Sequence, residues 1–285
     1  MAGIDVPRSF SGSVQLAGMA LDGLLAAAAG PAPRLLVALP PDAGLPRLLA
    51  PALAAAAAPP PCLLYDDWSV YRADRDAAPA GDAAPRLLFS AEAAPPLPAC
   101  GLAVLFLPKG NEAIERALSR VAHLVEPGGR VLVVGAKKSG IVSSRRLAER
   151  RVGPFEASRS GRHAKLLAYR RAPEVPPPSD GERRYTAEAW GRRVEVATLP
   201  GVFSHGRLDD GTRVLLERWT PPAFGTALDW GCGGGVLAAA LRLARPAARV
   251  DAADARAEAL EATRRTLAAN RLEAEIGRAS CRERV

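Results

Sequence analysis

Three glycines at alternate positions separate a short apolar run from a helical pattern late in the chain. Gly231, Gly233 and Gly235 follow residues 227–229 and precede the apolar segment 236–244. Glycine has no Cβ atom, so the backbone can turn sharply there and a ligand can approach the N-terminus of the next helix. A strand, a glycine loop and a helix in this order predict the start of a doubly wound α/β sheet.

Two acids flank this loop. Asp229 ends the strand before it, and Asp254 follows the next predicted strand, 249–253. The spacing Gly-x-Gly-x-Gly differs from the Gly-x-Gly-x-x-Gly of dinucleotide enzymes, whose helix N-terminus holds a pyrophosphate. S-adenosylmethionine has no phosphate; its ammonium group suits Asp229, and its ribose hydroxyls suit Asp254. The predicted S-adenosylmethionine contacts are Asp229, Gly231, Cys232, Gly233, Gly235 and Asp254.

Simpler interpretations of the same residues stay open. The glycines could form a tight turn without a ligand. Cys232 is most simply a small buried residue, since no base or second cysteine lies near it in the sequence. The four cysteines contain no Cys-x-x-Cys pair, so we expect neither a disulfide framework nor a metal site, and a reducing compartment fits best.

Short apolar runs alternate with helical patterns along the rest of the chain. The predicted strands are 35–39, 63–65, 87–89, 103–107, 131–134, 165–169, 193–198, 227–229 and 249–253. Helices are predicted at 111–125, after the acidic cap 209–212, at 236–244 and at 257–270. The proline-rich segment 172–184 has linker composition. We therefore expect a first domain at 1–171, a linker at 172–184 and a second domain at 185–275.

The positive charge is concentrated in one segment. Residues 130–171 hold 12 Lys and Arg against 2 Asp and Glu, whereas residues 1–129 hold 9 against 12 and residues 172–285 hold 17 against 16. Such a field attracts polyanions, because each neutralised phosphate releases a counterion. The segment predicts RNA binding through Lys137, Lys138, Arg145 and Arg146, with Arg150 and Arg151 nearby. The alternative is a solvated helix face.

The sequence indicates no secretion signal and no membrane span. No basic region precedes an apolar run at the N-terminus, and Asp22 interrupts the stretch 16–29. The alanine run 54–58 is far shorter than the roughly 20 apolar residues that cross a bilayer. We expect a soluble, cytoplasmic protein with no membrane partner.

Several segments resemble the bacterial ribosomal RNA guanine-N2 methyltransferases that act on the small subunit. They are 199–204, 208–212, 229–235 and 266–270, with 107–111 and 133–141 upstream. The resemblance implies an α/β protein with two Rossmann-like methyltransferase-type domains, the N-terminal one degenerate and without cofactor, the C-terminal one incomplete. The segment 39–44, which lacks the glycine pattern, agrees with a degenerate first domain. The implied reaction is S-adenosylmethionine-dependent methylation of the exocyclic N2 amine of a guanine in 16S-type ribosomal RNA, with that RNA or the small subunit as partner.

One motif of the family is missing. Its chemistry depends on a later Asn-Pro-Pro-aromatic motif, and this sequence contains no Asn-Pro-Pro, so we assign no catalytic residue. The last ten residues, 276–285, resemble a translated sequencing adapter, so we expect them to lie outside the fold and this chain to be inactive. The alternatives are a natural polar tail, a non-catalytic RNA-binding protein and a small-molecule methyltransferase. A gene sequence that encodes Asn-Pro-Pro-Phe or Asn-Pro-Pro-Tyr in frame after codon 275 would favour the enzyme over these alternatives.

Overall fold

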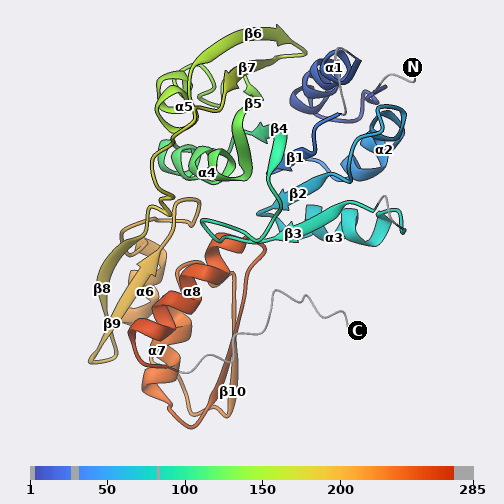
Figure 1. The fold of residues 1–285 in the computed structure, drawn as a ribbon. Coiled ribbons are helices and arrows are strands. Elements are labelled where there is room, and N and C mark those ends of the chain that lie inside the picture. Colours follow the sequence, from blue (N-terminus) through green and yellow to red (C-terminus); the bar gives the residue numbers. More distant parts are fainter. Residues whose placement is uncertain (1–3, 27–31, 82–83, 273–285) are drawn as a thin grey trace. The chain divides into compact units, whose positions relative to one another are not determined.

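The computed structural model describes residues 4–26, 32–81 and 84–272, and the chain divides into two compact units, Met1–Ser179 and Asp180–Val285 (Figure 1). Both units mix helices with β-strands, so the predicted α/β class is confirmed. The segment 276–285, expected to be foreign to the fold, lies outside the described residues.

The first unit is built on a seven-stranded sheet of order β3-β2-β1-β4-β5-β7-β6. The strands are β1 (Leu35–Ala38), β2 (Cys62–Tyr65), β3 (Arg86–Phe89), β4 (Cys100–Phe106), β5 (Val125–Ala136), β6 (Phe155–Gly161) and β7 (Ala164–Arg170). Neighbours from β3 to β5 pair in parallel, and β7 lies antiparallel between β5 and β6. The strand order reverses between β1 and β4, which makes this a doubly wound sheet.

Helices cover both faces of this sheet. They are α1 (Gly12–Ala26), α2 (Leu45–Ala55), α3 (Trp68–Ala77), α4 (Asn111–Leu124) and α5 (Arg145–Arg151). Leu36 of β1 lies in one core cluster with side chains of α4 and α5, while its neighbours Leu35 and Val37 lie in another with side chains of α1 and α2. Successive side chains of a strand point to opposite faces, so both faces of β1 are buried, as a parallel sheet requires.

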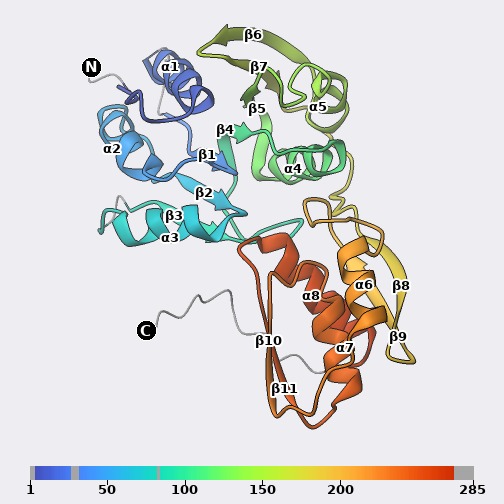
Figure 2. The ribbon, with the colours of Figure 1, turned by 180° about the vertical axis from the view of Figure 1, so that it is seen from behind.

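The second unit pairs its strands in twos. A hairpin joins β8 (Arg183–Ala189) to β9 (Arg192–Thr198), and β10 (Thr226–Trp230) runs parallel to β11 (Arg249–Ala253), which lies beside it in Figure 2. The helices are α6 (Asp210–Arg218), α7 (Val236–Ala244) and α8 (Ala257–Ala269). Arg183 and Arg184, assigned to the linker from its composition, are instead the first residues of β8.

The two units share an order of elements. The run α1-β1-α2-β2-α3 in the first unit corresponds to α6-β10-α7-β11-α8 in the second, and both strand pairs are parallel. In each unit a glycine in the left-handed conformation caps the helix after the first of these strands: Gly44 (φ 100°) before α2 and Gly235 (φ 76°) before α7. The second unit therefore repeats the beginning of the first.

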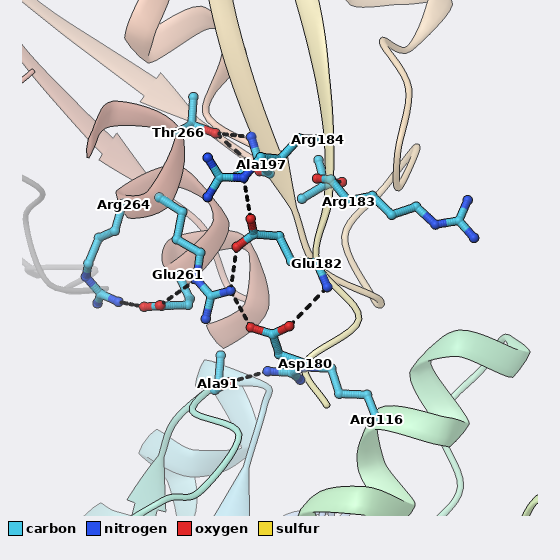
Figure 3. A network of polar contacts seen from close by, with 12 residues as sticks. Ala91, Arg116, Asp180, Glu182, Arg183, Arg184, Ala197, Glu261, Arg264 and Thr266 are labelled. Atoms are coloured by element: carbon cyan, nitrogen blue, oxygen red, sulfur yellow. Dashed lines mark hydrogen bonds and ion pairs between the residues drawn. The ribbon is translucent and has the colours of Figure 1, made fainter. Parts of the chain in front are cut away.

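A network of charged side chains ties the start of the second unit to α8 (Figure 3). Arg265 of α8 reaches Asp180, Glu182 at 2.7 Å and Glu261 at 3.0 Å. Glu182 also accepts a hydrogen bond from the Arg184 guanidinium. Because one guanidinium contacts three carboxylates, the chain before β8 is held against α8.

Within the described ranges, no helix is long and apolar enough to cross a membrane. The same residues contain no group of three His, Cys, Asp or Glu side chains that could hold a metal ion.

Candidate functional site

The glycine loop 231–235 turns between β10 and α7 through three left-handed residues. The φ angles are 79° at Gly231, 53° at Gly233 and 76° at Gly235. The N–H groups of Gly231 and Cys232 donate to the carbonyl oxygen of Ala253, at 2.8 and 3.1 Å. These bonds fasten the loop to the end of the neighbouring strand β11.

The predicted glycines meet different surroundings. A Cβ atom on Gly231 would have no heavy atom within 4 Å, and one on Gly233 would meet only Val202 Cγ1 and Gly231 O, at 3.9 and 4.0 Å. A Cβ on Gly235 would lie 2.9 Å from Thr263 Cα, a backbone atom of α8. Gly231 and Gly233 therefore face open space, whereas Gly235 lets α8 pack against the loop.

Asp229 is almost buried, with 8% of its surface exposed. Its Oδ2 accepts a hydrogen bond from the N–H of Ala238 in the first turn of α7, at 3.0 Å. Burial raises the pKa of this carboxyl, the Ala238 N–H opposes the rise, and the nearby charge of Asp254 adds to it. No cation among the described residues contributes to this pKa shift. A cationic group placed beside Asp229 would therefore be strongly attracted.

Asp254 braces the loop. Its Oδ2 accepts from the N–H of Gly233 at 3.1 Å, and its Oδ1 accepts from the N–H of Arg256 at 2.8 Å, just before α8. Each carboxylate oxygen can accept a second hydrogen bond, so these contacts leave acceptor capacity.

An open pocket lies beside the loop. Of the predicted contacts, Asp229, Gly231, Cys232 and Gly233 line it, while Gly235 and Asp254 do not. A second wall comes from the last residue of β9 and the segment that leads from it to α6, which the sequence interpretation did not assign to the site. This wall includes Thr198, Phe203, Ser204, Arg207, Leu208 and Asp209. The signal that pointed to it was its overlap with the resembling segments 199–204 and 208–212.

Hydrogen bonds hold this second wall in place. Thr198 Oγ1 accepts from the N–H of Gly206 at 2.9 Å. Asp209 caps α6 by accepting from the N–H groups of Gly211 and Thr212, at 3.1 and 2.8 Å, so the predicted acidic cap is confirmed. Phe203 lies on the segment between these anchors with 81% of its surface exposed. A fixed wall thus presents an aromatic ring at the pocket.

Cys232 does not have the surroundings of a nucleophile. It is buried, and Thr263 Oγ1 lies 3.2 Å from its sulfur. Burial raises the pKa of this thiol to about 12. The thiol is therefore neutral near pH 7, as expected of a small buried residue.

The four predicted RNA contacts lie in the first unit and are exposed. Lys137 and Lys138 occupy the turn after β5, and Arg145 and Arg146 begin α5 (Figure 1). The N–H of Lys137 donates to the carbonyl oxygen of His163 at 3.1 Å, so this turn adjoins the β6–β7 hairpin.

Some of the arginines in this basic segment already have partners. Arg145 lies 3.2 Å from Glu149 and stacks over the ring of Phe155, with 3.9 Å from its guanidinium carbon to the ring centroid. The Arg151 guanidinium forms a two-pronged ion pair with Glu115 of α4, at 2.5 and 2.9 Å. Arg151 therefore joins α5 to α4.

Two family models match the chain: Methyltransferase small domain N-terminal over residues 63–179, and Methyltransferase small domain over residues 193–285. Ribosomal RNA small subunit methyltransferase C of Stutzerimonas stutzeri (strain A1501) is 40% identical over 188 residues, 64% of this chain and 55% of that protein. Its counterpart in Pseudomonas aeruginosa (strain LESB58) is 42% identical over 177 residues, 61% and 52% of the two chains. The chain spans about half the length of these curated relatives.

A solved structure is similar along most of the chain. It is the T. thermophilus 16S rRNA N2 G1207 methyltransferase (RsmC) in complex with AdoMet and guanosine, with a TM-score of 0.70 and 25% sequence identity. The similarity covers 90% of this chain and 68% of that one. With the two domain models and the curated relatives, it shows that the chain belongs to the ribosomal RNA small subunit methyltransferase family.

Proposed function

We propose that this protein serves the transfer of a methyl group from S-adenosylmethionine to the exocyclic N2 amine of a guanine in small-subunit ribosomal RNA. The observation that carries the proposal is the buried Asp229, whose pKa is raised by burial, at a pocket formed by a glycine loop. A carboxylate there favours a cationic ligand, and the relative from T. thermophilus was solved with AdoMet and guanosine. A ribosomal RNA substrate would agree with a cytoplasmic location, which belongs to this proposal.

The residues present suit the methyl donor. Asp229 would hold the ammonium group, and the remaining acceptor capacity of Asp254 suits ribose hydroxyls. Gly231 and Gly233 leave room for the ligand because neither presents a side chain to the pocket. When bound, S-adenosylmethionine supplies an electrophilic methyl group. We assign cofactor contacts to this chain and no catalytic side chain.

The reaction places a demand on positioning. The guanine amine is a poor nucleophile because its lone pair is conjugated with the ring, so most of the rate must come from holding it in line with the methyl group. In this proposal the chain holds the methyl donor, S-adenosylmethionine, between Asp229 and the second wall of the pocket. Phe203, exposed on that wall, offers a face on which a planar base can stack.

Two measurements test the proposal. Calorimetric titration of S-adenosylmethionine into the 285-residue chain should show one binding site. Labelled methyl groups should reach small ribosomal subunits that lack the modification, as N2-methylguanosine, when an Asn-Pro-Pro-aromatic segment of a relative replaces residues 276–285. The 285-residue chain itself should transfer none, because binding a donor does not align the acceptor. Absence of cofactor binding would contradict the proposal. Transfer by the 285-residue chain would show instead that the catalytic residues lie within this sequence.

We further propose that the basic surface of the first unit binds RNA phosphates. Changing Lys137, Lys138 and Arg146 to alanine should weaken RNA binding and flatten its salt dependence by about 0.7 to 0.9 in log–log slope per lost contact. Arg151 is kept, because its loss would break the ion pair with Glu115. Filter binding to ribosomal RNA at several salt concentrations measures both quantities.

A triple variant of equal charge change serves as the control. Arg47, Arg75 and Arg86 are exposed in the part of the first unit that carries excess negative charge, and their change to alanine should leave the slope almost unaltered. If the two triple variants behave alike, the segment 130–171 is only a solvated face.

A further inference from the structure

In the shared order of elements, α3 corresponds to α8, and each of these helices carries a side chain that contacts the loop after the first strand, β1 or β10. Asp74 is the seventh residue of α3 in the first unit, and Thr263 is the seventh residue of α8 in the second. Both side chains are buried, at 1% and 0% exposure. One structural position is therefore occupied by a carboxylate in one unit and by a hydroxyl in the other.

In the first unit, Asp74 accepts a hydrogen bond from a backbone N–H of the loop. The Asp74 carboxylate accepts hydrogen bonds from the N–H of Gly44, the cap of α2, and from the Tyr65 hydroxyl at 2.7 Å. The N–H at the start of α2 thus points at a buried carboxylate of the protein itself. This loop offers that donor to no ligand.

In the second unit the contact has the opposite polarity. The Thr263 hydroxyl lies 3.2 Å from the carbonyl oxygen of Gly233, and one turn later the Thr266 hydroxyl lies 2.6 Å from that of Gly234. Hydroxyls can donate to carbonyl oxygens, so α8 holds the acceptor side of the loop. In a trans peptide the N–H points away from the C=O, so holding the Gly233 carbonyl turns the N–H of Gly234 away from α8.

We propose that Thr263, supported by Thr266, is a positioning residue that sets the orientation of the glycine loop so that the N–H of Gly234 is available to the ligand. Gly234 lines the pocket, and a carboxylate such as that of the methionine end of the cofactor is the group its N–H would bind. This inference rests on the proposed function, since it assigns a role at the same site.

Thr263 is a cleaner probe than Thr266. Its hydroxyl contacts Gly233 O and Cys232 Sγ, both of which are in the loop. Thr266 Oγ1 also accepts from the N–H of Ala197 in β9 at 2.9 Å, so its loss would disturb the hairpin as well (Figure 3). The Thr263→Val variant keeps the size and branching of the side chain and removes only the hydrogen bond.

The experiment compares Thr263→Val with Thr263→Ser in the 285-residue chain. Titration of S-adenosylhomocysteine by calorimetry should show about a tenfold loss of affinity for the valine variant, and a value within about threefold of the unchanged chain for serine, because serine retains the donor. Hydrogen exchange of residues 231–238 in the ligand-free protein should be faster only in the valine variant. Unchanged affinity and unchanged exchange in that variant overturn the inference.

Two further comparisons keep the result decisive. If the valine variant does not fold, Thr263→Ala against Thr263→Ser tests the same hydroxyl without the methyl group. If the unchanged chain binds no S-adenosylhomocysteine, the proposed function fails, and exchange in the loop still decides whether Thr263 positions it. A uniform rise in exchange across the second unit would show a merely structural role and contradict the inference.

Discussion

Gly233→Val is expected to abolish S-adenosylmethionine binding, with a loss of more than about 100-fold in affinity. Gly233 lines the pocket, and a Cβ there would meet only two atoms within 4 Å, so a valine side chain would occupy the space beside the loop. The backbone also resists the change, because φ is 53° and left-handed geometry costs an L-residue about 1–2 kcal/mol. Calorimetry measures the affinity, and urea unfolding measures the backbone cost.

Two other variants separate these effects. Gly233→Asn places a comparable bulk at the pocket, and asparagine tolerates the left-handed region better than valine, so affinity should fall while most stability returns. Gly235→Ala should mainly lower the free energy of unfolding, because its Cβ would lie 2.9 Å from Thr263 Cα. Retained affinity in both Gly233 variants would mean that the cofactor does not approach this loop.

The elements around the loop were predictable because their signals are local. The predicted helix 236–244 and strand 249–253 match α7 and β11, and the predicted helix 257–270 differs from α8 by one residue. Periodic apolar residues follow a glycine loop there, and signals in neighbouring residues indicate where each helix and strand begins and ends. The start of the second sheet was therefore predictable from sequence.

Elements with weak local signals were missed. Helix α2 contains Pro51 in its interior, a residue that argues against a helix, yet Leu49 and Leu53 bury against the sheet and outweigh it. Strand β8 begins with two arginines, and only its two alanines are buried, so too little apolar periodicity remains to reveal it. Tertiary packing decides both elements.

Only the glycine-loop side of the site was predictable from the sequence. The second wall depends on Thr198 and Asp209 holding the intervening segment, and the lining residues Phe203 and Ser204 follow no periodic pattern. The roles of the arginines were equally hidden, because Glu115, the partner of Arg151, lies 36 residues away in the sequence. Contacts between distant segments assign these roles.

Asp229→Asn is expected to lower cofactor affinity at pH 7 by about 10- to 100-fold, the range for losing a hydrogen bond to a charged group. The asparagine Oδ1 can still accept from the N–H of Ala238, as Asp229 Oδ2 does at 3.0 Å, so the start of α7 stays capped. Only the charge that attracts the ammonium group is removed. Asp210→Asn on α6, whose side chain is 79% exposed, makes the same charge change at a residue that does not line the pocket, and this variant should bind the cofactor normally.

The pH dependence gives this prediction its sharpest test. Burial raises the pKa of Asp229 above the ordinary 3.8, so the folded protein favours its neutral form. The stability that the neutral form contributes is present below about pH 3.8 and is lost as the pH rises through the raised pKa. Thermal unfolding without ligand should therefore show that the stability of the asparagine variant rises relative to that of the unchanged chain as the pH rises, up to a plateau.

Cofactor binding should show a different pH dependence. Affinity should weaken in the unchanged chain as acid neutralises Asp229, and it should not change with pH in the variant. If both proteins share one pH profile for binding, Asp229 is not the group that holds the ammonium.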